Sequence, residues 1–297
     1  MSSTLPAAAV VPVPDEPPFV APRWRWLRKH PTLVLGAVLL AAIVVLSIGA
    51  PWIATHDPQD IDPLARLKPP TAEHWFGTDA LGRDVFSRAV WGGQVSLVTG
   101  LGVAGLATVF GVVIGLFAGF VRAADGAVMR IMDGLMAIPG ILLAIALMSV
   151  MRPSLATVII AITIPDIPRV ARLVRSLALT LREQLYVEAA HAVGTRLPTI
   201  LWRHVLPNMM PPLVVQATFM AAAAMLAEAA LSFLGVGVPA QQMPSWGNMM
   251  AEGRNFFAVA FHIILYPGIL LATMVLATNL LGDGLRDVLD PRLARQL

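Results

Sequence analysis

Residues 95–121 read VSLVTGLGVAGLATVFGVVIGLFAGFV, and no charged side chain interrupts them. A helix needs about 20 apolar residues to cross the hydrocarbon core of a bilayer, and this stretch is longer. Gly111, Gly115 and Gly119 recur every four residues, so they form a smooth stripe along one side of the helix. Such a stripe lets a second helix backbone approach closely. The stretch therefore predicts a transmembrane helix packed tightly against another helix, rather than one whose glycines line a pore.

The whole chain has the composition of an integral membrane protein. Of its 297 residues, 57% are hydrophobic and 13% are charged, and the mean hydropathy is +0.74. Globular domains carry about 25% charged residues. The net charge of +3 is small and the basic residues lie between apolar segments, which disfavours a nucleic-acid partner and is typical of residues that orient membrane helices. Since the chain has no cysteine, disulfides, thiolate nucleophiles and cysteine metal sites are excluded.

Further apolar stretches predict further transmembrane helices, at residues 32–54, 131–150, 155–179, 213–233 and 261–281. In the stretch 155–179, Pro165, Asp166 and Pro168 interrupt the apolar residues. This span is nevertheless needed if all the arginine-rich loops are to lie on one side of the membrane, as the positive-inside rule requires. The predicted fold class is an all-α membrane protein with six transmembrane helices and both termini in the cytoplasm.

These spans divide the chain into four parts. Residues 1–22 are rich in proline and predict a disordered cytoplasmic tail. Residues 23–92 hold the first transmembrane helix, whose apolar stretch is too long for a signal peptide, and an extracytoplasmic loop. Residues 93–285 form a core of five transmembrane helices, in which Pro-Gly pairs at 139–140 and 267–268 are expected to bend two spans near a passage. Residues 286–297 are a cytoplasmic tail.

Residues 77–93, GTDALGRDVFSRAVWGG, predict an amphipathic helix on the outer membrane surface. Apolar residues spaced four apart would share one face, and two pairs of opposite charges have the spacing that stabilises a helix. Thr78 or Asp79 would cap the first turn. The apolar positions are Leu81, Val85 and Ala89, and the charge pairs are Asp79 with Arg83 and Asp84 with Arg88.

Residues 180–212 are polar enough to lie in the cytoplasm, and they predict a helical hairpin. Thr180 and Glu183 have the spacing of a capping box, and Gly194 suits the left-handed turn that ends a helix. A second short helix would begin at a Thr195 cap and end near Pro207. A hairpin projecting between two spans is suited to binding by a soluble partner in a helix-accepting groove. Its first helix carries a stripe of Leu181, Leu185, Ala189 and Val193 opposite Arg182, Glu188 and His191.

The hairpin resembles the EAA loop of importer permeases. It contains Glu188-Ala189-Ala190, then Gly194, and it closes on Leu206-Pro207. The family pattern usually has isoleucine two places before that Leu-Pro pair, where this chain has His204. Together with GTDALGRDVFSR, with PSWG at 244–247 and with LLGDGLRDVLDPRL at 280–293, the loop is similar to the second permease subunit of dipeptide and oligopeptide ABC importers. The resemblance extends from about residue 23 to the C-terminus.

The resemblance implies a type I importer fold in a bacterial inner membrane. It implies a heterodimer with a sister permease, two ATPase domains that bind ATP and Mg²⁺, and an extracytoplasmic substrate-binding protein. Membrane lipid surrounds such a subunit. The cargo of similar importers includes dipeptides, longer peptides, glutathione, metal chelates and haem-like compounds. The residues that the resemblance assigns to ATPase coupling are Glu188, Ala189, Ala190, Gly194, His204, Leu206 and Pro207.

No catalytic motif is expected in this chain. A phosphate-binding loop ends in Gly-Lys-Ser/Thr, but the two lysines, Lys29 and Lys68, do not follow glycines. The sequence contains neither His-Glu-x-x-His nor Gly-x-Ser-x-Gly. We therefore expect a non-enzymatic subunit without a cofactor or metal of its own, with ATP hydrolysis carried out by partner subunits.

Two acids, Asp166 and Glu228, lie within apolar spans, where an isolated carboxylate is costly. Asp166 is three residues from Arg169 and is expected to pair with it. Glu228 either reaches a partner helix or faces a watery passage for a peptide's amino terminus. A rival hypothesis makes both acids a proton relay in an ion-coupled secondary transporter, but it leaves the hairpin unexplained and no inverted repeat is evident. A non-transporting scaffold would leave the acids and the bent helices without a purpose.

Overall fold

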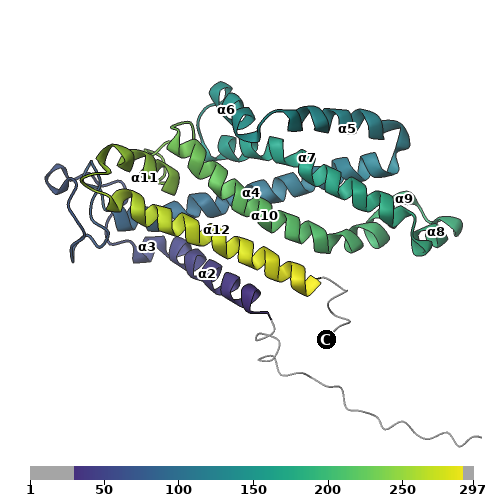
Figure 1. Cartoon of the computed structure of the whole chain (residues 1–297), viewed down its shortest axis with the longest axis horizontal. Helices are drawn as coiled ribbons and strands as arrows, with labels where there is room; N and C mark the ends of the chain where they lie inside the picture. The colour runs from purple at the N-terminus through teal and green to yellow at the C-terminus, as the bar shows by residue number, and fades with distance from the viewer. Residues whose placement is uncertain (1–29, 290–297) are drawn as a thin grey trace, which may run out of the picture.

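The computed structural model describes residues 30–289, which form an elongated bundle of helices without a β-strand in that range (Figure 1). The predicted tail 1–22 and residues 290–297 lie outside the described part, whereas 286–289 continue the last helix. The long helices are α2 (Pro31–Ile48), α4 (Val85–Phe120), α5 (Arg122–Ala137), α6 (Gly140–Val150), α7 (Leu155–Arg182), α10 (Leu206–Phe233) and α12 (His262–Leu289). The short ones are α3 (Ala50–Ile53), η1 (Pro63–Ala65), α8 (Leu185–Ala192), α9 (Leu197–Ile200), the π turn η2 (Leu201–Val205), α11 (Trp246–Gly253) and η3 (Arg254–Phe256).

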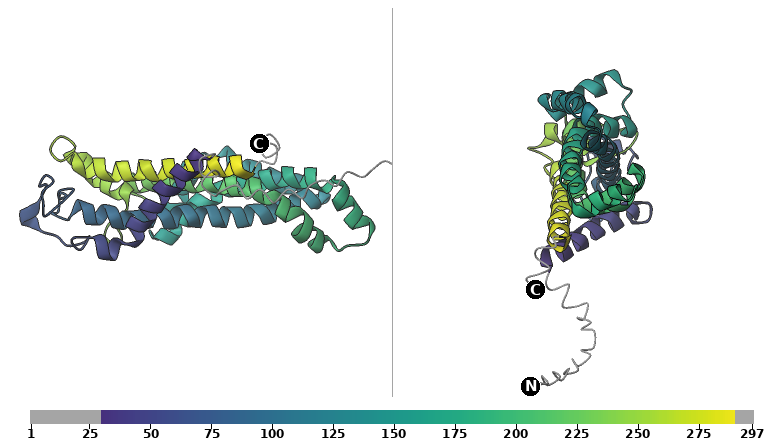
Figure 2. Two further views of the ribbon diagram at one scale, coloured as in Figure 1. Left: turned by 90° about the horizontal axis from the view of Figure 1, so that it is seen from below. Right: turned by 90° about the vertical axis from the view of Figure 1, so that its right-hand side faces the viewer.

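The long helices pack in a simple lateral order. α2 lies against α12, α12 against α10, α10 against α4 and α4 against α7, with α5 and α6 along the outer side of α7 (Figures 1 and 2). Small residues allow close approach where α2 crosses α12, because a Cβ atom on Gly36 would lie 2.6 Å from the backbone nitrogen of Leu281. The order leaves apolar faces of α2, α4 and α12 exposed, as expected for helices that meet lipid or a partner.

The glycine stripe of α4 packs against α7, as the sequence predicts. A Cβ atom on Gly111 would lie 2.4 Å from Cβ of Val170, and one on Gly115 would lie 2.6 Å from the carbonyl oxygen of Ala171. Such distances are shorter than real Cβ contacts, so only glycine permits this separation of the two helices. The stripe is therefore a helix-packing surface.

By length and composition, α2, α4, the helical stretch 197–233 and α12 can each cross a membrane. α5 and α6 form a fifth candidate, bent by 88° where Ile138 and Pro139 separate them. The predicted break at 139–140 is thus confirmed, whereas α12 continues through Pro267 as one helix. α7 is also continuous through Pro165 and Pro168, but its polar residues keep it outside the candidate spans. The described helices therefore support four or five spans, and the sixth remains a prediction.

The predicted amphipathic helix at 77–93 is wrong in its first half. Residues 77–84 form a loop, and the helix begins at Val85, with the Asp84 carboxylate accepting a hydrogen bond from the Ser87 backbone N–H at 2.8 Å. Gly77 and Gly82 have φ angles of +77° and +82°, which a right-handed helix excludes. The charged residues of this segment are buried at the end of the bundle, and α4 continues from here through the predicted second span.

The helix boundaries around the predicted hairpin also differ from expectation. Thr180 lies inside α7, which ends at Arg182, so it caps nothing, and Gln184 occupies the N-cap of α8. Arg196, rather than Thr195, precedes α9. Pro207 does not end the second helix, because it lies in the first turn of α10, and the π turn η2 joins α9 to α10 in one helical stretch.

Candidate functional site

The hairpin α8–α9 forms one end of the bundle, beyond α7 and the start of α10 (Figure 1). Gly194 connects its two helices with a φ angle of +78°, which confirms the predicted left-handed turn. The space around a Cβ atom at this position is open, so the requirement for glycine is conformational rather than steric. The Thr195 backbone N–H donates to the carbonyl oxygen of Ala190 at 3.0 Å and closes the turn.

The hairpin has its own buried contacts. Val187 and Ala190 of α8 are buried together with Ile200 and Val205 at the junction with α10. These residues belong to the same core cluster as α4 and α7. Since a buried core holds the two short helices to the bundle, the hairpin can transmit a displacement instead of absorbing it.

The opposite side of α8 is apolar and exposed. The exposed fraction is 82% for Leu185 and 81% for Val193, and Ala189 lies between them in solvent. Trp202 of the π turn is 77% exposed. Of the predicted stripe, Leu181 is partly buried against the core, whereas Leu185, Ala189 and Val193 point away from the bundle. The buried residues of α8 are Val187 and Ala190 instead. Exposed apolar side chains gathered at one tip are typical of a surface that a partner covers.

The remaining predicted coupling residues surround this tip. Glu188 is exposed and lines a hollow of about 580 Å³ that Arg122, Arg182 and His191 also line. The His204 ring lies 6.4 Å from the Tyr186 ring, measured between centroids. At the start of α10, Leu206 is partly buried and Pro207 is exposed. The structure thus brings the seven predicted residues to one end of the molecule.

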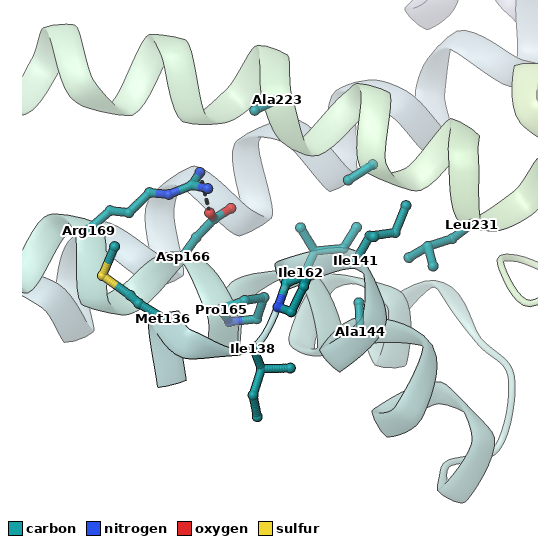
Figure 3. A pocket seen from close by; sticks show the side chains of 13 residues that line it. Met136, Ile138, Ile141, Ala144, Ile162, Pro165, Asp166, Arg169, Ala223 and Leu231 are labelled. Atoms are coloured by element: carbon teal, nitrogen blue, oxygen red, sulfur yellow. Dashed lines mark hydrogen bonds and ion pairs between the residues drawn. The ribbon is translucent and has the colours of Figure 1, made fainter. Parts of the chain in front are cut away.

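A cavity of about 320 Å³ lies where the bend between α5 and α6 meets α7 and α10 (Figure 3). Asp166 is buried on its wall, and Arg169 Nη1 lies 3.0 Å from Asp166 Oδ1, which confirms the predicted ion pair. The other lining side chains are mostly apolar. The result is an apolar chamber with one charged pair, beside a break in a helix.

Glu228 does not line this cavity, although Ala227 of the same helix does. Its side chain is fully buried, and Ser232 Oγ donates a hydrogen bond to Oε1 at 2.8 Å. The same Ser232 oxygen accepts from the Val238 backbone N–H at 3.3 Å. Among the described residues, Glu228 Oε2 has no hydrogen bond of ordinary geometry, although the Ser245 side chain also interacts with this carboxyl group. Asp166 and Glu228 therefore occupy separate environments.

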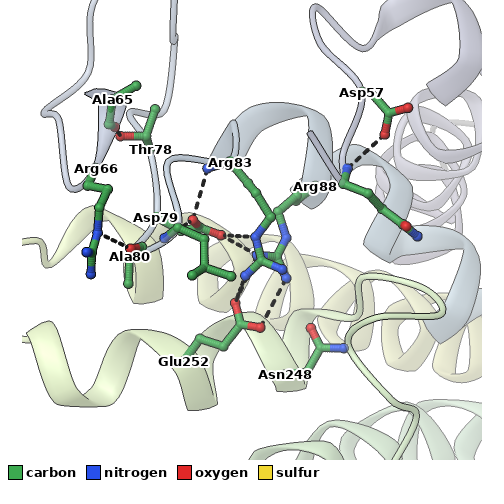
Figure 4. A network of polar contacts seen from close by, with 12 residues as sticks. Asp57, Ala65, Arg66, Thr78, Asp79, Ala80, Arg83, Arg88, Asn248 and Glu252 are labelled. Atoms are coloured by element: carbon green, nitrogen blue, oxygen red, sulfur yellow. Dashed lines mark hydrogen bonds and ion pairs between the residues drawn. The ribbon is translucent and has the colours of Figure 1, made fainter. Parts of the chain in front are cut away.

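The opposite end of the bundle holds a buried charge network, of which the sequence predicted one pair (Figure 4). Arg83 Nε lies 2.7 Å from Asp79 Oδ2, and Arg83 Nη2 lies 2.7 Å from Glu252 Oε2. Arg88 pairs with the same two acids. The network joins the loop 77–84 to α4 and α11. The predicted Asp79–Arg83 pair is confirmed. The predicted Asp84–Arg88 pair is wrong, because Arg88 pairs with Asp79 and Glu252, whereas Asp84 contacts His74. Glu252 is too distant in the chain to be assigned from spacing.

An inward-facing structure of the methionine ABC transporter MetNI matches the fold with a TM-score of 0.50 at 22% identity, covering 65% of this chain and 94% of that chain. The helical arrangement thus resembles that of the matched chain of this transporter. Residues 111–295 match the family described as binding-protein-dependent transport system inner membrane component, and residues 21–70 match the N-terminal transmembrane domain of oligopeptide transport permease C. The chain belongs to the binding-protein-dependent permease family, and it is a multi-pass inner-membrane protein.

Several proteins named as transport permeases are similar over nearly their whole length. A probable peptide ABC transporter permease, y4tQ of Sinorhizobium fredii, is 51% identical over 92% of this chain and 93% of the relative. The dipeptide transport system permease DppC of Alkalihalophilus pseudofirmus is 40% identical over 96% of both. The glutathione transport system permease GsiD of Pectobacterium atrosepticum is 40% identical over 91% of this chain and 89% of the relative.

Proposed function

We propose that this subunit moves short peptides inward across the cytoplasmic membrane, driven by ATP hydrolysis in partner subunits. The observation that carries the proposal is the exposed apolar tip of the α8–α9 hairpin, held rigidly on a bundle whose other helices suit a membrane. Exposed apolar side chains gathered at one place mark a surface for interaction, and a soluble partner is the occupant that we propose for this one. Relatives named for dipeptides and for glutathione, itself a short peptide, support this class of cargo.

The proposed topology has six spans, with α7 as the fourth, and both termini in the cytoplasm. Arg172 and Arg175 of α7 pair with Asp133 and Asp125 of α5 at 2.5 Å, so their charges are compensated within the bundle. Compensated arginines near the end of a helix are tolerated at a membrane boundary. This arrangement puts the hairpin in the cytoplasm and the buried charge network on the outer side.

The proposed assembly contains a sister permease, two ATPase domains with ATP and Mg²⁺, and an extracytoplasmic protein that delivers the peptide. The ATPase covers the hairpin tip, with Glu188 offering a charge to a basic group of the partner. The cavity beside Asp166 and Arg169 is a candidate stretch of the passage, because its ion pair can meet the charged ends of a peptide. Glu228 remains a second candidate, through its buried Oε2.

The decisive experiment is gentle purification of the tagged chain from its own membrane, followed by reconstitution with the proteins that accompany it. We expect an ATPase to co-purify. We also expect dipeptide uptake into the vesicles to require ATP on the side of the membrane on which the hairpin lies. Uptake that persists without ATP hydrolysis but collapses with the proton gradient would favour the secondary transporter instead.

A further inference from the structure

Three side chains that suit a metal ion meet at the end of the bundle opposite the hairpin. His56 follows α3, and Glu73 and His74 lie in the segment that leads to α4. One ligand atom from each residue lies within 4.8 Å of the ligand atoms of the other two. The two imidazole rings lie 4.7 Å apart between centroids. The cluster thus brings together two parts of the chain that are distant in sequence.

A carboxylate orients the first imidazole. His74 Nδ1 lies 3.0 Å from Asp84 Oδ1, and an ionised carboxylate can only accept, so Nδ1 carries the proton and donates it. The lone pair of His74 is therefore on Nε2. Asp84 is itself fixed, because it caps the first turn of α4 through the Ser87 backbone N–H. A histidine whose other nitrogen donates to a carboxylate is the usual arrangement around protein-bound zinc.

The same carboxylate orients the second imidazole through a hydroxyl group. Thr55 Oγ1 lies 3.3 Å from Asp84 Oδ2, to which it can donate its proton. His56 Nδ1 lies 3.0 Å from Thr55 Oγ1, and in the tautomer in which Nδ1 donates to this hydroxyl the lone pair is again on Nε2. Both histidines can therefore present the metal-binding tautomer while Asp84 holds them, His74 directly and His56 through Thr55.

We propose that His56, Glu73 and His74 bind a divalent transition-metal ion, with Zn²⁺ as the best-fitting chemistry. Two imidazole nitrogens and one carboxylate oxygen, with water as the fourth ligand, form a common zinc set. Zn²⁺–ligand bonds of about 2.0–2.2 Å require the three ligand atoms to lie closer together than the 4.8 Å within which they lie here. The exposed Glu73 side chain can rotate inward to bring its carboxylate closer to the two imidazoles. Mg²⁺ and Ca²⁺ prefer oxygen ligands and are disfavoured by the imidazoles. Bound metal would fasten the segment after α3 to the start of α4.

The test is a titration of ZnCl₂ into the purified full-length chain, prepared with a histidine-free tag and stripped with a chelator. We expect saturation at one equivalent. His56→Asn and Glu73→Gln should each weaken binding by about 10-fold or more, and Thr55→Val, which removes only the orienting hydroxyl, should weaken it by about 10-fold. His74 stays unchanged because it is largely buried against Asp84.

Matched controls come from both ends of the bundle. His191→Asn removes an exposed histidine of the hairpin, and Asp60→Asn removes an exposed acid near the cluster, and neither should alter the titration. Thermal unfolding in metal-free buffer checks that each variant is folded. X-ray absorption of the zinc-loaded wild type should show imidazole ligands. Identical titrations for the wild type and the double variant His56→Asn, Glu73→Gln, or a spectrum without imidazole, would overturn the proposal.

Discussion

At one end of the bundle, the hairpin leaves Leu185, Val193 and Trp202 in water, while at the other end Arg83 and Arg88 bury their charges against acids. The chain itself does not bury the apolar side chains of the tip, whereas the charges of the network pair with one another within the chain. The comparison separates a surface shaped for a partner from a part that stabilises the chain alone. Substitutions in the network should therefore lower the free energy of unfolding, and substitutions at the tip should weaken the coupling between the bundle and the ATPase.

The largest loss of stability is expected from Arg88→Met. Arg88 is 1% exposed and pairs with Asp79 and Glu252, so its removal leaves Arg83 as the one arginine that pairs with both acids in the described network. Breaking a buried ion pair from one side costs about 3–5 kcal/mol. The measurement is the thermal unfolding midpoint of the purified chain in detergent. Arg66→Met is the control, because Arg66 is exposed and donates only to the Ala80 carbonyl at 2.6 Å. Equal midpoints for the two variants would contradict the stabilising role of the network.

A smaller loss is expected from Gly111→Ala in α4. The new Cβ atom would meet Cβ of Val170 at 2.4 Å, and such overpacking costs about 1–3 kcal/mol. Gly105→Ala is a matched control on the same helix, since nothing lies within 4 Å of its Cβ position. It should be neutral or stabilising by about 0.5–1 kcal/mol, as alanine favours helix over glycine. If both variants unfolded at the same temperature, close packing of α4 on α7 would not matter for stability.

The smallest effect on stability is expected from Arg169→Gln at the cavity. The Arg169 side chain is 56% exposed, so its ion pair with Asp166 is worth less than about 1 kcal/mol. Unfolding midpoints of this variant and of the wild type should nearly coincide, while dipeptide uptake should fall if the cavity is part of the passage. An unfolding midpoint as low as that of Arg88→Met would contradict this and show that Arg169 contributes as much to stability as Arg88 does.

The sequence was sufficient for features that depend on local spacing. The glycine repeat at 111, 115 and 119 predicted a packed helix, Gly194 predicted a left-handed turn, and the three-residue spacing predicted the Asp166–Arg169 pair. Each of these follows from helix periodicity or from the conformational freedom of one residue.

Features that depend on distant contacts were missed. Periodicity grouped Leu185, Ala189 and Val193 on one face, but only the position of α7 decides which face of α8 is buried. The segment 77–84 has the charge spacing of a helix, yet Gly77 and Gly82 adopt positive φ angles. Its charged side chains also contact other segments, as Arg83 does with Glu252. Local patterns do not reveal that Glu252 supplies the second acid.

Substrate-stimulated ATP hydrolysis by the reconstituted complex tests most directly whether the hairpin couples the bundle to the ATPase. Gly194→Val should reduce stimulation by roughly 5- to 150-fold, the range of typical coupling free energies, because valine resists a φ angle of +78°. Gly126→Val on α5 is the control, since its Cβ position is equally open and its φ is not positive. We expect lost stimulation for Gly194→Val alone, with delivery-protein binding unchanged in both variants. Wild-type stimulation in Gly194→Val would contradict it and show the hairpin to be a passive connector.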